Sequence, residues 1–278
     1  MGSVHIVTDS ACDLPPENIA GKPVTVVPLT IRFGGDEFVD RKDLTPKEFW
    51  SKVKASPVLP ETAAPPPGAF EQAYRDAIGA GAEGIVCITL SGDLSATYQS
   101  AELAAKSITD VPIRVVDSKS ITMGLGFMGL AALEAAEAGK GVDDVAGAVE
   151  DLIPRSYVYG CLDTLDNLKK GGRIGGAQAF LGSLLSIKPI INISSGVVEE
   201  EAKQRTRAKS LKYLADKVNS AGEVERLAVM HGSAPDVDLL IDLLATNFPR
   251  DQIVVGEIGA VIGAHGGPGV VGVSYVTA

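Results

Sequence analysis

The stretch GIVCITLSGDLSATYQS (residues 84–100) decides the fold of this chain. Its first seven residues are a continuous apolar run of strand length, which is typical of a strand buried on both faces of a sheet. A polar loop follows, and Ser95 then stands where an N-cap residue would open a helix. A strand that passes through a short loop into a helix is the repeating unit of a parallel α/β sheet.

Similar units surround this stretch in the first half of the chain. Further buried strands are expected at VHIVT (4–8), VTVVPL (24–29) and IRVVD (113–117), and helices at about 69–80, 121–138 and 142–153. A capping box at Thr45–Glu48 predicts one more helix. The proline-rich segment 56–68 is expected to be a stiff extended loop. We predict an N-terminal three-layer α/β/α domain with a parallel sheet, over residues 1–160.

The second half of the chain follows a different pattern. Strands are expected at 157–161, 226–231, 253–258 and 269–276, a hairpin around Ser195-Gly196, and helices at 177–186, 210–218 and 238–248. Hairpin and crossover connections together predict a second α/β domain with a mixed sheet, over residues 161–278.

Composition excludes several classes of protein. The 278 residues are 45% hydrophobic and 22% charged, which indicates a folded chain, and the net charge of -10 disfavours nucleic-acid and anionic-membrane binding. The longest uncharged apolar stretch, 121–133, is too short to span a bilayer, and no signal-peptide core opens the sequence. We expect a soluble cytoplasmic protein with no nucleic-acid partner and no stable membrane insertion.

The usual signatures of metal, nucleotide and hydrolase sites are weak or missing. Cys12, Cys87 and Cys161 are far apart and lie in contexts that suit buried thiols, and the three histidines lack metal-ligand spacing. Two segments, 124–129 and 267–272, match G-x-G-x-x-G, but neither opens a helix directly after a strand. Close backbone packing explains them better than a nucleotide does. A nucleotide-using enzyme that binds through 124–129 remains an alternative.

Hydroxyl groups follow the predicted strands of the first sheet. Because the carboxyl ends of parallel strands meet at one edge, Ser91, Ser95 and Ser118 are expected near one another. Ser95 would add the positive end of a helix dipole, which suits a small anion such as a carboxylate. The alternative is that Ser95 only caps its own helix. Arg173 and His265 lie in glycine-rich turns and could approach the same ligand, although most isolated arginines are solvated.

The motifs taken together resemble the DegV family of bacterial fatty-acid-binding proteins. They are TDSACDLP, ETAAPPPGAF, LSGDLSATYQSA, VVDSKS, LDTLDNLKKGGRI, IKPII and HGGPGVVG, and they extend over about residues 4–277. The resemblance implies two α/β domains with a ligand slot between them. It also implies a long-chain fatty acid, such as palmitate, as the bound ligand, held for lipid transport or fatty acid metabolism.

The resemblance assigns roles to particular residues. Thr62 and Ser95 match the family's carboxylate ligands, and Arg173 and His265 match groups at the carboxylate end or facing a partner. Some family members present the acyl group to the catalytic subunit of a fatty acid kinase, which implies no enzyme activity, cofactor or metal in this chain. The family's usual Ser-Gln after the loop threonine is Ala63-Ala64 here, and its glycine after the helix-opening serine is Ala96. A non-lipid regulatory module with a closed slot is therefore a further alternative.

Overall fold

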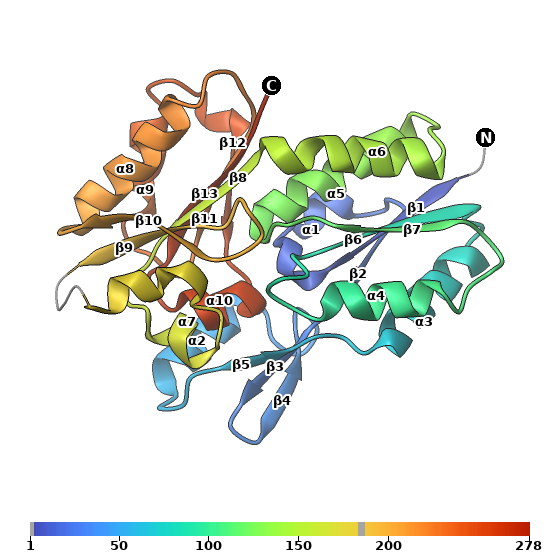
Figure 1. Cartoon of the computed structure of the whole chain (residues 1–278), viewed down its shortest axis with the longest axis horizontal. Helices are drawn as coiled ribbons and strands as arrows, with labels where there is room; N and C mark the ends of the chain where they lie inside the picture. Colours follow the sequence, from blue (N-terminus) through green and yellow to red (C-terminus); the bar gives the residue numbers. More distant parts are fainter. Residues whose placement is uncertain (1–2, 183–186) are drawn as a thin grey trace.

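In the computed structural model, which describes residues 3–182 and 187–278, a parallel sheet and a mixed sheet lie side by side (Figure 1). Helix α5 (Thr122–Glu137) contacts strands of both sheets and so lies between them. The chain passes from the first sheet to the second through α6 (Val142–Leu152) and the short helix η2 (Ile153–Arg155). The predicted class, a parallel and a mixed α/β half, is confirmed.

The first sheet has four parallel strands in the order β2-β1-β6-β7. These are β2 (Val24–Val27), β1 (Val4–Asp9), β6 (Gly84–Thr89) and β7 (Ile113–Asp117). Helices α3 (Pro67–Gly79) and α4 (Thr97–Ala105) cover one face, and α5 and α6 cover the other (Figure 1). All six residues of β6 are buried, because a continuous apolar run suits a strand with helices on both faces.

The second sheet has six strands in the order β10-β9-β8-β13-β11-β12. They are β8 (Ser156–Cys161), β9 (Lys188–Asn192), β10 (Glu199–Gln204), β11 (Val224–His231), β12 (Ile253–Glu257) and β13 (Val271–Thr277). Only β11 and β12 pair in parallel. Helices α8 (Arg207–Asn219) and α9 (Val237–Leu244) bury a separate core against one face. The other face is turned toward the parallel half, and the predicted hairpin of β9 and β10 is present.

A small third sheet corrects the prediction for the region between residues 24 and 68. Strands β4 (Asp36–Val39), β3 (Thr30–Phe33) and β5 (Glu61–Ala63) pair in that order, so the segment expected to be only an extended loop contains a strand. The reason is long-range pairing of Thr62 with Ile31, which leaves no local signal in a three-residue strand. Helix α2 (Pro46–Ala55) follows β4, and its predicted capping box is confirmed by both reciprocal hydrogen bonds.

Two helical segments also differ from the expectation. The predicted apolar helix at 177–186 begins instead as a 3-10 helix, η3 (Gly175–Gly182), and residues 183–186 lie outside the described part. Helix α10 (Ala260–Gly266) was not predicted, because it contains two glycines, has a glycine at each flank and lacks a polar face. The remaining short helices are η1 (Ser10–Cys12), α1 (Pro16–Ile19), α7 (Asp166–Lys170) and η4 (Arg250–Gln252).

Specific contacts tie the two halves together around α10. The Trp50 indole of α2 donates to the carbonyl oxygen of Ile258, which lies between β12 and α10, at 2.9 Å. The Asp13 carboxylate accepts from Gly259 N at 2.9 Å and from Arg41 Nη2 at 3.0 Å. These buried hydrogen bonds fix the start of α10 against the N-terminal half. Within the described ranges, no helix is long and apolar enough to cross a membrane.

Candidate functional site

An apolar slot lies between the two halves of the molecule. About 860 Å³ there is free of protein atoms, a figure that includes the space open to solvent at the mouth. Aliphatic side chains from both halves form most of its wall: Leu29, Leu90, Leu94, Ile121, Val158, Leu162, Leu168, Ile191, Ile193, Val198, Met230, Ile258, Val261, Ile262, Val270 and Val273. Ala63 and Ala64, which replace the family's Ser-Gln, are not among the residues of this wall.

Four polar side chains predicted from the sequence all line this slot. Thr62 comes from β5, Ser95 from the loop before α4, Arg173 from the turn after α7, and His265 from the last turn of α10. Two hydrogen bonds connect these segments. Thr62 bonds His265, and Arg173 donates to the carbonyl oxygen of Leu94, the residue before Ser95. Four residues from distant segments thus form one polar group, which is called the polar end below.

The imidazole of His265 is held as a neutral ring against Thr62. Its Nε2 lies 2.9 Å from Thr62 Oγ1, while its Nδ1 is buried without a partner among the described residues. Burial, and secondarily the Arg173 charge, lowers the pKa of His265 to about 4. Gly171 makes room for the ring, since a Cβ there would lie 2.4 Å from His265 Nδ1. When Nε2–H donates to Thr62 Oγ1, the threonine proton is free to point at an anion in the slot.

His265 was expected on a glycine-rich turn, and this expectation is wrong. The residue occupies the final turn of α10, and the turn begins only at Gly267, whose φ is +75°. The distinction matters because a helix fixes the direction of the ring more firmly than a turn would.

Arg173 is anchored, contrary to the picture of a free side chain on a glycine turn. Its Nε donates to the Leu94 carbonyl oxygen at 3.1 Å, and its Nη1 donates to the Gly171 carbonyl oxygen at 2.7 Å. These bonds connect the turn after α7 with the loop that carries Ser95. The positive charge is therefore held in place within the polar end.

Ser95 does not occupy the N-cap position that was predicted for it. Helix α4 begins at Thr97, Ala96 is the N-cap, and the Ser95 hydroxyl accepts from Thr97 N at 3.3 Å and pairs with Thr97 Oγ1 at 2.8 Å. The hydroxyl still lies beside the positive end of the α4 dipole and lines the slot. Because a hydroxyl has both a proton and two lone pairs, contact with Thr97 leaves it capacity for a ligand.

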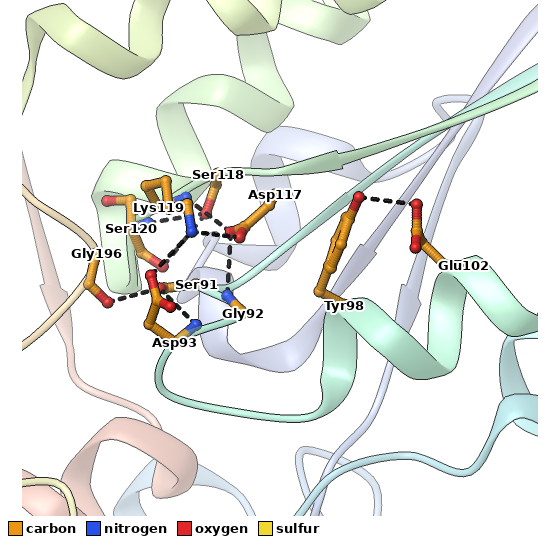
Figure 2. Close-up of polar contacts among 10 residues, drawn as sticks. All are labelled: Ser91, Gly92, Asp93, Tyr98, Glu102, Asp117, Ser118, Lys119, Ser120 and Gly196. Carbon is orange, nitrogen blue, oxygen red and sulfur yellow. Dashed lines mark hydrogen bonds and ion pairs between the residues drawn. The ribbon is translucent and has the colours of Figure 1, made fainter.

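Ser91 and Ser118 lie in a different cluster, which joins the β9–β10 hairpin to the N-terminal half (Figure 2). The Ser91 hydroxyl donates to the Gly196 carbonyl oxygen at 2.6 Å, and Ser118 bonds the backbone of Ser120. Lys119 forms ion pairs with Asp93 and Asp117, at 2.8 and 3.0 Å. Ser91 and Ser118 are completely or almost completely buried and are absent from the slot wall. The structure therefore gives them contacts within the loops that border the slot.

The motif TDSACDLP (residues 8–15) is also structural. Asp9 accepts hydrogen bonds from Ala11 N and Leu90 N, at 2.9 and 2.7 Å, and so joins the ends of β1 and β6. Burial raises the pKa of Asp9 to about 7. Ser10 accepts from Leu29 N at 3.1 Å. Asp9 and Ser10 therefore serve as hydrogen-bond acceptors for backbone N–H groups.

The glycine motifs serve packing. Residues 124–129 lie wholly within α5, and a Cβ at Gly124 or Gly126 would come within 2.6 Å of Val158 Cγ2 or 2.8 Å of the Cys12 carbonyl oxygen. A segment in the body of a helix uses its backbone N–H groups internally, so it cannot form a phosphate-binding turn. The three cysteines are free and buried, as expected.

Some slot residues were missed in the sequence. Leu29, Thr122, Tyr159 and Ser274 line the slot. Thr122 follows the carboxyl end of β7, a position that could have drawn attention to it. The described residues include no group of three or more His, Cys, Asp or Glu side chains placed to hold a metal ion.

Comparison with known proteins identifies the family. The model of the family described as "Uncharacterised protein, DegV family" matches residues 3–278. The chain belongs to the DegV family. A DegV domain-containing protein of Streptomyces coelicolor is 40% identical over 275 residues, which are 97% of each chain.

Solved DegV structures have the same fold. A fatty-acid-binding DegV protein of Thermus thermophilus superimposes with a TM-score of 0.91 and 34% identity, covering 99% of this chain and 100% of its own. DegV of Bacillus subtilis, a fatty acid binding protein, superimposes with a TM-score of 0.89 and 30% identity, covering 100% of both chains.

Proposed function

We propose that this protein binds a long-chain fatty acid, such as palmitate, in the slot, with the carboxylate held by Thr62 and Ser95. The observation that carries the proposal is a mainly aliphatic slot in which the Thr62, Ser95, Arg173 and His265 side chains form one polar end. Such a division of polar and apolar groups matches an amphipathic ligand with one charged terminus. The fatty-acid-binding DegV proteins of Thermus thermophilus and Bacillus subtilis support the same ligand class.

The polar end has the donors that a carboxylate requires. The Thr62 proton is available when the neutral His265 ring donates to Thr62 Oγ1, and Ser95 contributes a second hydroxyl beside the α4 N-terminus. Each charge-assisted hydrogen bond contributes about 1.5–3 kcal/mol, whereas each buried methylene contributes about 0.8 kcal/mol. The acyl chain therefore dominates affinity, and the carboxylate contacts fix its direction.

We further infer that the chain carries and presents its ligand, without turning it over by itself. The support is the family resemblance together with Arg173, whose positive charge is held in the polar end by two hydrogen bonds. A kinase partner that phosphorylates the carboxylate would use that charge in contact with phosphate. The reaction would be measured as ATP-dependent formation of acyl phosphate that requires both proteins.

The binding proposal is tested with Thr62→Val, Ser95→Ala and the double variant. Loss of one hydroxyl should weaken palmitate binding about tenfold to a hundredfold, because one charge-assisted hydrogen bond disappears. The double variant should lose less than the product of the two effects, since both donors share one carboxylate. Affinity is measured by displacement of a fluorescent fatty acid, with melting temperature as a check of folding.

Matched controls are available at exposed sites away from the slot. Thr246→Val and Ser51→Ala each remove a hydroxyl that bonds only a local helix carbonyl, so neither should change palmitate affinity. Native mass spectrometry of the purified protein gives a second readout through any co-purified acid. Wild-type affinity in a folded double variant would contradict the assignment of the carboxylate site.

A further inference from the structure

Two glycines face the slot from the middle of the six-stranded sheet. Gly160 of β8 and Gly272 of β13 are directly paired, and both line the slot. Met230 pairs with Gly272 on one side, and Ile191 pairs with Gly160 on the other. The row therefore reads Met230, Gly272, Gly160, Ile191 across four adjacent strands, with side chains at both ends and none in the middle. This row of four slot-lining residues is called the furrow below.

The furrow lies between the polar end and helix α5. Val270, just before β13, and Gly272 and Ser274 of β13 line the slot, and alternate residues of an extended chain follow one another on one face at intervals of about 7 Å. Val270 packs at the end of α10, since a Cβ at Gly266, the neighbour of His265, would lie 3.3 Å from Val270 Cγ2.

The opposite end of the slot lies against α5. Ser274 pairs with Val158, and a Cβ at Gly124 of α5 would lie 2.6 Å from Val158 Cγ2. A chain that enters from the polar end must therefore cross the glycine pair before it reaches the Val158 row beneath α5.

We propose that the Gly160–Gly272 pair sets the usable depth of the slot and so selects long, unbranched acyl chains. This inference rests on the proposed function and adds the determinant of chain length. A pair of residues without Cβ atoms lets a chain of methylenes lie close to the backbone between the Met230 and Ile191 side chains. A side chain at either glycine would occupy that path, so only chains that end before the pair would keep all their contacts.

The two glycines differ in how they tolerate substitution. A Cβ at Gly272 would lie 2.8 Å from the Tyr159 carbonyl oxygen, so the backbone would have to move. A Cβ at Gly160 would meet only Ile191 side-chain atoms, at 3.6 and 3.9 Å, which are ordinary contacts. An alanine at Gly160 therefore fits without strain, and alanine or valine suits a strand better than glycine does.

The experiment compares wild type, Gly160→Ala and Gly160→Val for binding of octanoate, laurate, palmitate and stearate by displacement of a fluorescent fatty acid. Each methylene excluded from the slot weakens binding about fourfold, so exclusion of two methylenes weakens it about fifteenfold. Gly160→Val should therefore bind palmitate and stearate at least about fifteenfold more weakly while octanoate affinity stays within about twofold. Gly160→Ala should lie between wild type and Gly160→Val.

Gly147→Ala in α6 is the matched control, because nothing lies within 4 Å of a Cβ there and the site is exposed. It should leave the whole chain-length profile unchanged. An unchanged ratio of palmitate to octanoate affinity in folded Gly160→Val would overturn the depth assignment, and Gly160→Ala decides the point if the valine variant does not fold. Wild-type protein that binds none of the four acids would instead refute the proposed function itself.

Discussion

Replacing His265 by glutamine should remove a specific acid sensitivity from the folded protein. Nε2 of the histidine lies 2.9 Å from Thr62 Oγ1, and the amide of glutamine can reach the same position without carrying a titratable group. Burial and the Arg173 charge lower the pKa of His265 to about 4 in the folded state, against about 6.5 for an unfolded histidine. The variant therefore isolates the cost of protonating this ring.

The sign follows from the direction of the shift. Below about pH 6.5 the unfolded state takes up a proton at this position and the folded state does not. The free energy of unfolding therefore decreases as the pH is lowered, until the folded ring titrates near pH 4. At pH 5 the loss amounts to about 2 kcal/mol, and it is nearly absent at pH 7.5. Asp9 and Asp40 contribute with the opposite sign, because burial raises the pKa of Asp9 to about 7 and that of Asp40 to about 6.

The measurement is therefore a double difference. Free energies of unfolding in urea, followed by circular dichroism on delipidated protein, are compared between wild type and His265→Gln at pH 7.5 and pH 5. The contributions of Asp9 and Asp40 cancel between the two proteins, and wild type should lose about 2 kcal/mol more than the variant on acidification. A double difference near zero would show that the folded ring accepts its proton freely, which refutes its description as a desolvated neutral group.

Two further predictions concern how the halves are held together. Trp50→Phe leaves the buried Ile258 carbonyl oxygen without its donor and should cost about 1–3 kcal/mol in urea unfolding; no change would mean that water replaces the indole. Gly196→Ala should destabilise by about 1–3 kcal/mol, since φ is +91° and a Cβ would lie 2.9 Å from Lys119 Cδ. Gly222→Ala is the control for backbone strain alone, because φ there is +85° and nothing lies within 4 Å of an added Cβ. Equal losses of unfolding free energy in the two variants would show that the contact of the β9–β10 hairpin with Lys119 contributes nothing.

The sequence by itself determined the elements with strong local signals. The apolar run 84–90 predicted a strand buried on both faces, and the reciprocal side chains of Thr45 and Glu48 predicted the start of a helix. Both signals depend on neighbours within a few residues, so they survive without knowledge of the tertiary fold. Motifs spread over the whole chain also identified the family, and with it Thr62, Ser95, Arg173 and His265 as a set.

Only the tertiary structure decided how those residues meet. Strand β5 exists because Thr62 pairs with Ile31, and that pairing carries the threonine to the slot. Helix α10 exists because Gly263 allows close contact with Phe49 and Trp50, where a Cβ would lie 2.6 and 2.7 Å from their ring carbons.

The same long-range packing sets the depth of the slot and keeps the His265 ring neutral. The furrow needs Gly160 and Gly272, which are more than a hundred residues apart in the chain, to pair directly on adjacent strands. The low pKa of His265 needs burial by the opposite half of the molecule. Such properties arise from contacts between segments distant in sequence, so no local pattern of residue types encodes them.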